Sequence, residues 1–317
     1  MGSQACLRSV QPTDFPAGRE PNRSRTLQRW GKSSKMVRRR SGTGSGPIEV
    51  SPLLDVADGM TWHTIALILI LAGVADALAM ALWYACSWPA SQVLGPALVR
   101  GPRTGRRVAL TFDDGPASPY TEQILDILRK HGVRATFFVC GKDVEQHPEI
   151  VRQIHAEGHT LGNHTWSHPY LYFMSRGKMA GEIDRTQKAI YAATGQVARL
   201  FRPPYGGRWF GLYPLLRKRD MKLIQWSVNG YDWQLDAAGI SASVSAGMVP
   251  GAVILLHDGR QAPGGYFQRI LKKMSVPEGR IPPPANRSET VAALPAILEH
   301  ARAAGFEFAP VEDFCSS

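Results

Sequence analysis

The 317-residue sequence has few cysteines and few acidic residues, and both shortages limit what the protein can be. Its four cysteines, Cys6, Cys86, Cys140 and Cys315, show no spaced framework, so no disulfide scaffold is indicated. Only 26 Asp and Glu residues oppose 37 Lys and Arg residues, which gives a net charge of +11. No internal repeat is present apart from an alternation of strand-like and helix-like stretches.

The positive charge is concentrated at the beginning of the chain. Residues 1–60 are rich in Arg, Ser, Gly and Pro, and contain ten basic residues against five acidic ones, including the run Arg38-Arg39-Arg40. This composition predicts a disordered basic tail. Nucleic-acid binding is an alternative interpretation of the arginines. No interleaved aromatic residues or nucleic-acid-binding motif accompany them, so we expect no nucleic acid partner.

An apolar run at residues 65–84 follows the tail and is interrupted only by Asp76. Twenty helical residues span about 30 Å, the thickness of a bilayer core. Aromatic residues suited to the membrane interface flank the run at Trp62, Trp83, Tyr84 and Trp88. We therefore expect a transmembrane signal anchor at residues 64–85 and a linker at 86–104. A buried soluble helix and a cleaved signal peptide are the alternatives.

The charge before the anchor predicts its orientation. The positive-inside rule places the basic tail in the cytoplasm and the remainder of the chain outside the membrane. We therefore expect a single-pass membrane protein whose N-terminus is cytoplasmic and whose catalytic domain is extracytoplasmic.

Two adjacent carboxylates end the first strand-like run after the linker. Residues 107–112 are typical of a buried strand, and Gly115-Pro116 terminates it. Asp113 and Asp114 leave the strand as neighbours, so one can hold a cation while the other handles a proton. An ordinary turn is the alternative interpretation.

A histidine pair adds to this signal. His164 and His168 are four residues apart, and on one helical turn both imidazoles would face one metal ion. Together with one carboxylate they would form a three-ligand site that leaves room for water or substrate. His155 and His159 have the same spacing, but Gly158 interrupts their helix, and we interpret that pair as structural.

Strand-like and helix-like stretches alternate through the rest of the chain. The helical patterns lie near residues 143–157 and 176–193, and the strand-like runs lie at 107–112, 134–139, 159–163, 199–202, 222–227, 252–256 and 306–310. This repeat predicts an α/β fold with parallel strands.

Five motifs, in order over about residues 105–312, resemble those of the polysaccharide deacetylases of carbohydrate esterase family four, also called the NodB-homology domain. They are Thr-Phe-Asp-Asp-Gly-Pro at 111–116, His-Thr-Trp-Ser-His at 164–168, Arg-Pro-Pro-Tyr-Gly at 202–206, Asp-Trp at 232–233 and Leu-Leu-His-Asp at 255–258. The resemblance implies a catalytic domain at 105–317, folded as a distorted (β/α) barrel of about seven parallel strands. The motifs would then lie at strand C-terminal ends, where barrel enzymes build their sites.

The resemblance also implies a role for each motif residue. Asp114, His164 and His168 match the ligands of a divalent metal, for which zinc is well suited. Asp113 matches the general base, and Arg202 the residue that pairs with it. The remaining matches are His257 as general acid, Asp232 as the carboxylate that orients it, the backbone N–H of Tyr205 as an oxyanion donor, and Trp233 and Leu255 as walls around the acetyl methyl group.

One position departs from the family pattern. Asn229 stands where the family often has an aspartate ahead of the Asp-Trp pair, which puts the loop geometry in doubt more than the catalysis. A long, basic connection at residues 260–286 follows His257, and it is either a specificity element or a surface insertion.

The function implied is metal-dependent hydrolysis of N-acetyl groups from an envelope glycan, either peptidoglycan or chitin-like N-acetylglucosamine, at the outer face of the membrane. Two alternatives remain open. The enzyme could be a deacylase or deformylase of a lipid-linked sugar, or an O-acetyl xylan esterase. The domain could also be an inactive glycan-binding module, although binding does not require both Asp113 and His257.

Overall fold

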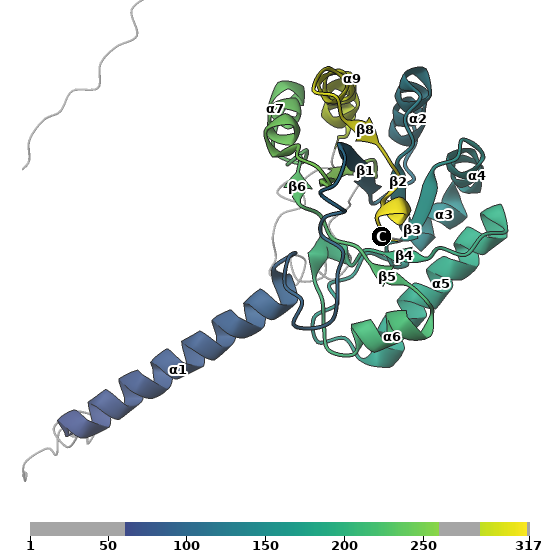
Figure 1. Ribbon diagram of the computed structural model, residues 1–317. Helices are drawn as coiled ribbons and strands as arrows, with labels where there is room; N and C mark the ends of the chain where they lie inside the picture. Colours follow the sequence, from purple (N-terminus) through teal and green to yellow (C-terminus); the bar gives the residue numbers. More distant parts are fainter. Residues whose placement is uncertain (1–60, 260–285, 316–317) are drawn as a thin grey trace, which may run out of the picture. The chain divides into compact units, whose positions relative to one another are not determined.

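The computed structural model describes residues 61–259 and 286–315 as an α/β domain that follows one long helix (Figure 1). The tail predicted at 1–60 and nearly all of the connection at 260–286 lie outside the described residues. Strands and helices alternate along the domain, which confirms the predicted fold class.

The described strands form one sheet in which every ladder between them is parallel. Their order is β5-β4-β3-β2-β1-β7-β6, and β8 pairs with the beginning of β1. Seven strands therefore follow one another around a curled, open barrel, as the resemblance implied. The strands are β1 (Arg107–Asp113), β2 (Thr136–Val139), β3 (Thr160–Asn163), β4 (Leu200–Phe201), β5 (Lys222–Leu223), β6 (Val228–Asn229), β7 (Val253–His257) and β8 (Glu307–Phe308).

The alternation of side chains along β1 explains how the sheet serves both a core and a site. Leu110 and Phe112 belong to the large apolar core that the helices cover, whereas Thr111 and Asp113 face the interior of the barrel, where both receive hydrogen bonds from one buried arginine. Side chains two residues apart share one face of a strand. The register pairs Asp113 with His257 of β7, so the two strands present both side chains at the same level.

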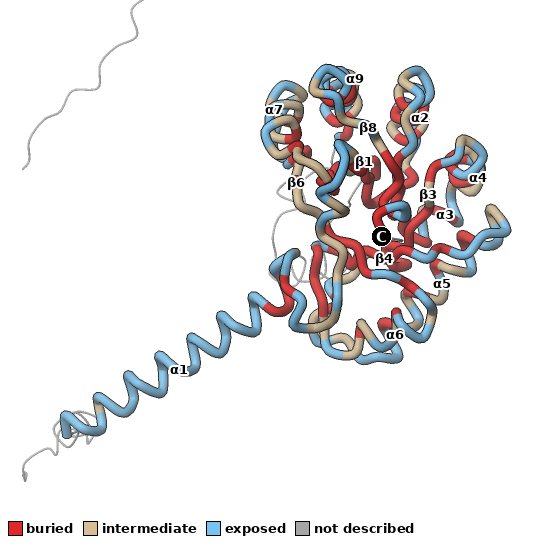
Figure 2. Tube along the Cα trace, in the orientation of Figure 1, coloured by how far each residue is buried: buried red, intermediate tan, exposed pale blue. Residues whose placement is uncertain are grey.

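Helices surround the outer face of the sheet (Figure 1). Their inner faces are buried and their outer faces are exposed (Figure 2). They are α2 (Tyr120–His131), α3 (Gly141–Gln146), α4 (Pro148–Ala156), α5 (Arg176–Thr194), α6 (Leu212–Lys218), α7 (Ala237–Gly247) and α9 (Ser288–Ala303).

The helical pattern near 143–157 is two helices rather than one. Proline cannot donate to the preceding turn but fits the first turn of a new helix, so Pro148 separates α3 from α4.

The helix before the domain, α1 (Trp62–Ser87), has 26 residues and carries the predicted anchor. The mean hydropathy of its most apolar 18-residue window is 2.5, so its length and composition are sufficient to cross a membrane. Almost all of α1 is exposed, and only Ala85 and Cys86 are buried (Figure 2). Pro89 follows its C-cap, which agrees with the usual end of a helix before proline.

Residues 88–104 follow α1 and include most of the predicted linker. Leu98 bonds the backbone on both sides of Ile224, donating to the carbonyl of Leu223 at 2.9 Å and accepting from the N–H of Gln225 at 2.8 Å. Gly101 donates to the carbonyl of Gly251 at 2.8 Å. This segment therefore bonds both to the chain just after β5 and to the chain just before β7, which lie toward opposite ends of the strand order.

Candidate metal and active site

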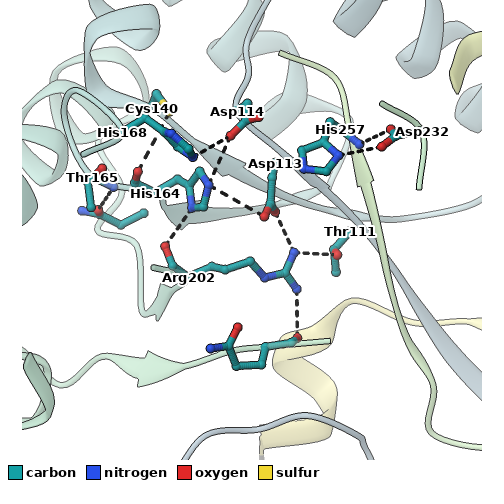
Figure 3. A network of polar contacts seen from close by, with 12 residues as sticks. Thr111, Asp113, Asp114, Cys140, His164, Thr165, His168, Arg202, Asp232 and His257 are labelled. Carbon is teal, nitrogen blue, oxygen red and sulfur yellow. Dashed lines mark hydrogen bonds and ion pairs between the residues drawn. The ribbon is translucent and has the colours of Figure 1, made fainter. Parts of the chain in front are cut away.

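Asp113 lies between two groups of functional side chains at the C-terminal ends of β1, β3 and β7 (Figure 3). On one side its Oδ2 is 3.8 Å from Nε2 of His164. On the other side it is paired in register with His257. The structure thus brings together residues that are up to 144 positions apart in sequence.

Asp114, His164 and His168 form the candidate metal site. Oδ1 of Asp114 lies 3.3 Å from Nε2 of His164 and 3.1 Å from Nε2 of His168. One ligand atom from each residue lies within 4.8 Å of the others. This is the arrangement in which three side chains can share one divalent ion.

The predicted helical turn between the two histidines is wrong. Residues 164–168 form an irregular segment after β3, in which Thr165 and His168 have φ angles of 69° and 54°. Asp114 also has a positive φ, at 77°. Non-glycine residues adopt this conformation at a cost of about 1–3 kcal/mol, and such residues cluster at functional sites. The backbone, rather than helical spacing, brings the two rings to 4.9 Å between centroids.

Two observations indicate that these residues fit a cation. Nδ1 of His164 lies 2.7 Å from the carbonyl oxygen of Arg202, which can only accept, so Nδ1 carries the proton and Nε2 is left as a ligand. Both carboxylate oxygens of Asp114 are buried without a hydrogen-bond partner among the described residues. Burial alone would raise the pKa of Asp114, but His168 and His164 hold that pKa well below its usual value. The carboxylate is therefore ionised and available to a metal.

Arg202 holds the carboxylate of Asp113. Its buried guanidinium donates to Oδ1 of Asp113 at 2.6 Å and to the hydroxyl of Thr111 at 2.8 Å through Nη1, and to the carbonyl of Gln225 at 3.1 Å through Nη2. The guanidinium also lies 4.1 Å above the ring of Phe138. A fully buried charge needs such compensation. Asp113 is consequently fixed in orientation and kept beside a positive charge.

His257 is held by Asp232 at two points. Nδ1 of His257 lies 2.7 Å from Oδ1 of Asp232, and the backbone N–H of His257 donates to Oδ2 at 2.7 Å. Burial opposes a charge on His257, but the carboxylate raises the pKa of the imidazole above its usual value. Nδ1 is occupied by Asp232, so Nε2 is the nitrogen that can serve a substrate in the cavity.

Two residues that belong to none of the sequence motifs support this pair. The hydroxyl of Thr290 donates to Oδ2 of Asp232 at 2.9 Å. The buried guanidinium of Arg287 lies 3.9 Å from both Asp232 and Asp114, and its Nε donates to the carbonyl of Gly259 at 2.8 Å. They lie about 30 residues after His257, beyond the last of the five motifs. Arg287 places one positive charge between two carboxylates that would otherwise repel each other.

These side chains open into a cavity of about 450 Å³. Trp233, Leu255 and Tyr205, which were expected to contact substrate, line it beside the two groups described above. The ring of Trp233 meets His257 edge-on, with 5.4 Å between centroids. Tyr205 has a φ of 58° within a short 3-10 turn, Pro204–Gly206.

The departure at Asn229 has a local explanation. Asn229 ends β6 and lines the cavity, and its Oδ1 accepts the backbone N–H of Tyr231 at 2.9 Å. An asparagine amide oxygen can accept this backbone N–H as well as an aspartate carboxylate oxygen can. The loop that carries Asp232 is therefore supported by the residue that departs from the pattern.

The His155–His159 pair is not brought to this site. His155 is exposed on α4, whereas His159 is buried and its Nδ1 accepts the backbone N–H of Ala135 at 3.1 Å. Burial lowers the pKa of His159 to about 4, so its ring is neutral. The contacts of His159 are those of a core residue.

The Asp232→Asn variant should lose activity at high pH first. A general acid must be protonated, and the fraction of protonated His257 falls as the pH rises through its pKa in the folded protein. Without the carboxylate, burial dominates and that pKa decreases, so the alkaline limb of the kcat/KM profile moves to lower pH. Thr290→Val keeps the carboxylate and serves as the control, with a smaller displacement expected. An unchanged alkaline limb in Asp232→Asn would contradict this assignment.

The polysaccharide deacetylase family matches residues 100–223 of the chain. The peptidoglycan-N-acetylglucosamine deacetylase PgdA of Listeria monocytogenes serotype 1/2a is 40% identical over 173 residues, which are 54% of this chain and 36% of that protein. The match therefore spans little more than a third of that relative. A chitooligosaccharide deacetylase of Bradyrhizobium sp. is 36% identical over 208 residues, covering 65% of this chain and 89% of that protein.

The solved structures agree with these relatives. A peptidoglycan N-acetylglucosamine deacetylase in complex with 4-naphthalen-1-yl-N-oxidanyl-benzamide superposes with a TM-score of 0.60 and 32% identity. The superposition covers 69% of this chain and 92% of that one. The structural similarity thus extends over nearly the whole of that solved chain.

Proposed function

Because this chain belongs to the polysaccharide deacetylase family, also called carbohydrate esterase family four, we propose that it hydrolyses N-acetyl groups of an N-acetylglucosamine glycan. One observation carries the proposal: a three-residue metal site, a base held by arginine and an acid held by aspartate surround one cavity. The names of the relatives favour peptidoglycan or chitooligosaccharide as the substrate class.

The proposed mechanism assigns one step to each side chain. Zinc bound by Asp114, His164 and His168 would lower the pKa of a water molecule and polarise the acetyl carbonyl. Asp113 takes the proton of the attacking water, and Arg202 keeps this carboxylate oriented. The backbone N–H of Tyr205 is the proposed donor to the oxyanion. Nε2 of His257 protonates the amine nitrogen as the C–N bond breaks, so acetate and a free amino sugar leave.

Zinc is proposed from the ligand chemistry. Two imidazoles and one carboxylate are a common catalytic set for zinc, and three protein ligands leave a coordination position open. Other divalent ions accept the same donors, and metal analysis of the protein as purified would distinguish them.

The proposed general acid, His257, favours an amide substrate over an ester. An amine is a poor leaving group that needs a proton on nitrogen, and the buried His257–Asp232 pair is built to keep that proton available. A lipid-linked sugar or acetylated xylan remains the runner-up substrate. An inactive glycan-binding module would need neither Asp113 nor His257.

Released products test the proposal directly. The full chain in detergent, loaded with zinc, should release acetate from N-acetylglucosamine oligomers and peptidoglycan, but little from acetylated xylan. Release of formate from an N-formyl sugar would instead support the runner-up. The matched control is Asp113→Asn, which should be inactive on every substrate. No product from any of them would reject a hydrolase function.

We also propose that α1 is an uncleaved anchor with the basic tail inside and the catalytic domain outside the cytoplasm. The support is the exposed apolar surface of α1 and the arginines before it. A reporter that is active only outside the cytoplasm is expected to be active when fused after Ser317. The same reporter fused after Met60, ahead of α1, is the control and should be inactive. An inactive reporter in the fusion after Ser317, or release of a soluble mature form, would reject this topology.

A further inference from the structure

A cluster of aromatic side chains outside the catalytic cavity is exposed on two neighbouring loops. It comprises Phe173, from the loop after β3, and Trp209 and Phe210, from the loop before α6; we refer to these three residues as the aromatic patch. The ring centroid of Trp209 lies 4.6 Å from that of Phe173 and 5.2 Å from that of Phe210. Phe173 is 84% exposed and Phe210 is 55% exposed. Large apolar groups gathered at the surface indicate a contact with another apolar phase or molecule.

The same two loops contact the C-terminal end of α1. The hydroxyl of Ser87, the last residue of α1, shares a hydrogen bond of 3.0 Å with the hydroxyl of Tyr172. The ring of Tyr172 in turn meets Trp209 edge-on, at 6.3 Å between centroids. One residue, Tyr172, therefore links the end of α1 to the aromatic patch.

Arg208 makes a second connection. Its backbone N–H donates to the carbonyl of Cys86 at 2.8 Å. Its buried guanidinium donates to the carbonyls of Trp88 and Ser91, just after α1. These bonds hold the loop of Trp209 against the end of α1. A flexible connection between α1 and the domain would make no such contacts.

The end of α1 carries its own interfacial residues. Trp83, Tyr84 and Trp88 are each about half exposed, and the rings of Tyr84 and Trp88 are stacked with 6.5 Å between centroids. Trp and Tyr are enriched where a membrane helix meets the headgroup layer. The aromatic patch is thus continuous with the part of α1 that would lie in this layer.

A basic side chain next to the patch adds a charge that suits anionic lipids. Arg176 is exposed and packs against Gly211, the residue after Phe210, where an added Cβ would lie 2.4 Å from its Nε. A basic residue near an anionic membrane surface is attracted to it. A combination of exposed aromatic and basic groups favours a lipid interface over a purely apolar partner.

We propose that Phe173 and Phe210, supported by the partly buried Trp209, insert at the boundary of headgroups and acyl chains in the same bilayer that α1 crosses, so that the catalytic domain lies against the membrane through this patch. This inference rests on the membrane position proposed above for α1. The aromatic patch would bind lipid, and it takes no part in the proposed hydrolysis.

The position of the patch bears on the substrate. Aromatic contacts lead from Tyr172 to Tyr170 at 6.3 Å, from Tyr170 to Tyr205 at 3.9 Å, and from Tyr205 to the ring of His168 at 4.6 Å. These rings connect the catalytic cavity, which Tyr205 and His168 line, to the loop of Phe173, which would face the bilayer. The substrate class that fits is an N-acetylated glycan close to the membrane surface, nascent or still attached to lipid, rather than the outer glycan of the envelope.

Fluorescence quenching by brominated lipid would test the patch without measuring activity. The full chain, with Cys6 and Cys315 replaced by serine, is reconstituted in vesicles of phosphatidylethanolamine and phosphatidylglycerol with brominated acyl chains. An environment-sensitive fluorophore is attached to Phe173→Cys or Phe210→Cys. Leu78→Cys, within α1, is the positive control, and Val197→Cys, an exposed position before β4, is the negative control.

The proposal expects quenching at positions 173, 210 and 78, and none at 197. Quenching at 78 without quenching at 173 and 210 would overturn the patch and leave the anchor intact. No quenching at 78 would overturn both. Loss of the lipid signal at 173 and 210 on addition of a soluble chitooligosaccharide would show that the patch binds glycan, and would also overturn the proposal.

A double variant separates docking from folding. Phe173→Ser with Phe210→Ser should retain bound metal and normal hydrolysis of a soluble N-acetylglucosamine oligomer. The same variant should act more slowly on an N-acetylated sugar attached to lipid in vesicles. Equal rates on the lipid-linked sugar for variant and parent would contradict a docking role.

Discussion

Replacement of Asp114, His164 or His168 by alanine is expected to abolish metal binding and activity together. Each substitution leaves two of the three donors, and three protein ligands are the usual number in a catalytic metal site. Each also removes a group that lies within 3.1–3.3 Å of another member of the site. Metal content of the purified variants, measured together with acetate release, checks this result.

His155→Ala is the matched control for the histidine variants. It belongs to a pair with the same spacing as His164 and His168 but is exposed on α4, so metal content and activity should both be retained. Full metal occupancy in all three ligand variants would show that the ion, if bound, sits elsewhere. Loss of metal in only one of them would indicate a different ligand set.

The comparison of sequence and structure shows why the motif residues could be predicted. Asp113 and Asp114 directly follow a run whose apolar character marks a buried strand, and Leu255 and His257 belong to another. Parallel strands place their C-terminal ends at one edge of a sheet, so residues at these ends converge. The strand pattern, together with the family resemblance, therefore placed two distant motifs at one edge of the sheet.

The local geometry of the ligands could not be predicted in this way. The spacing of His164 and His168 suggested a helix, but the two rings meet through an irregular segment with two positive φ angles. Such conformations depend on tertiary contacts, among them the bonds from the N–H groups of Trp166 and Ser167 to Glu182 of α5 at 2.9 and 2.8 Å. No periodicity in the sequence encodes these contacts.

The supporting residues were missed for a similar reason. Arg287 and Thr290 have no motif of their own and reach Asp232 and Asp114 only after α9 has packed against α2 and α7. The strand β6 was also missed, because it begins directly after the strand-like run at 222–227, of which only Lys222–Leu223 form a strand. Function-bearing positions near strand ends were thus easier to predict than the residues that hold them in place.

Substitution of the acid and the base should separate chemistry from metal binding. Asp113→Asn and His257→Ala are expected to retain metal but to lower kcat by about 10²–10⁴-fold, the usual contribution of a proton-transfer group. Asparagine is chosen at 113 because its amide oxygen can still accept from buried Arg202, whereas alanine would leave that charge unpaired. Single-turnover rates, measured with metal content and melting temperature, check this prediction.

The outcome of this pair decides between the enzyme and the inactive module. Asp126→Asn, an exposed carboxylate on α2, is the control for a loss of charge and should leave kcat unchanged. A module that only binds glycan would show no turnover in the parent protein, and its affinity for glycan would be unchanged by both substitutions. Near-normal turnover in both variants would mean that the acid and base are misassigned, whereas loss of turnover with intact metal identifies them as the groups that move protons. His257→Ala should also remove the alkaline limb that Asp232→Asn displaces, because both substitutions act on the same imidazole.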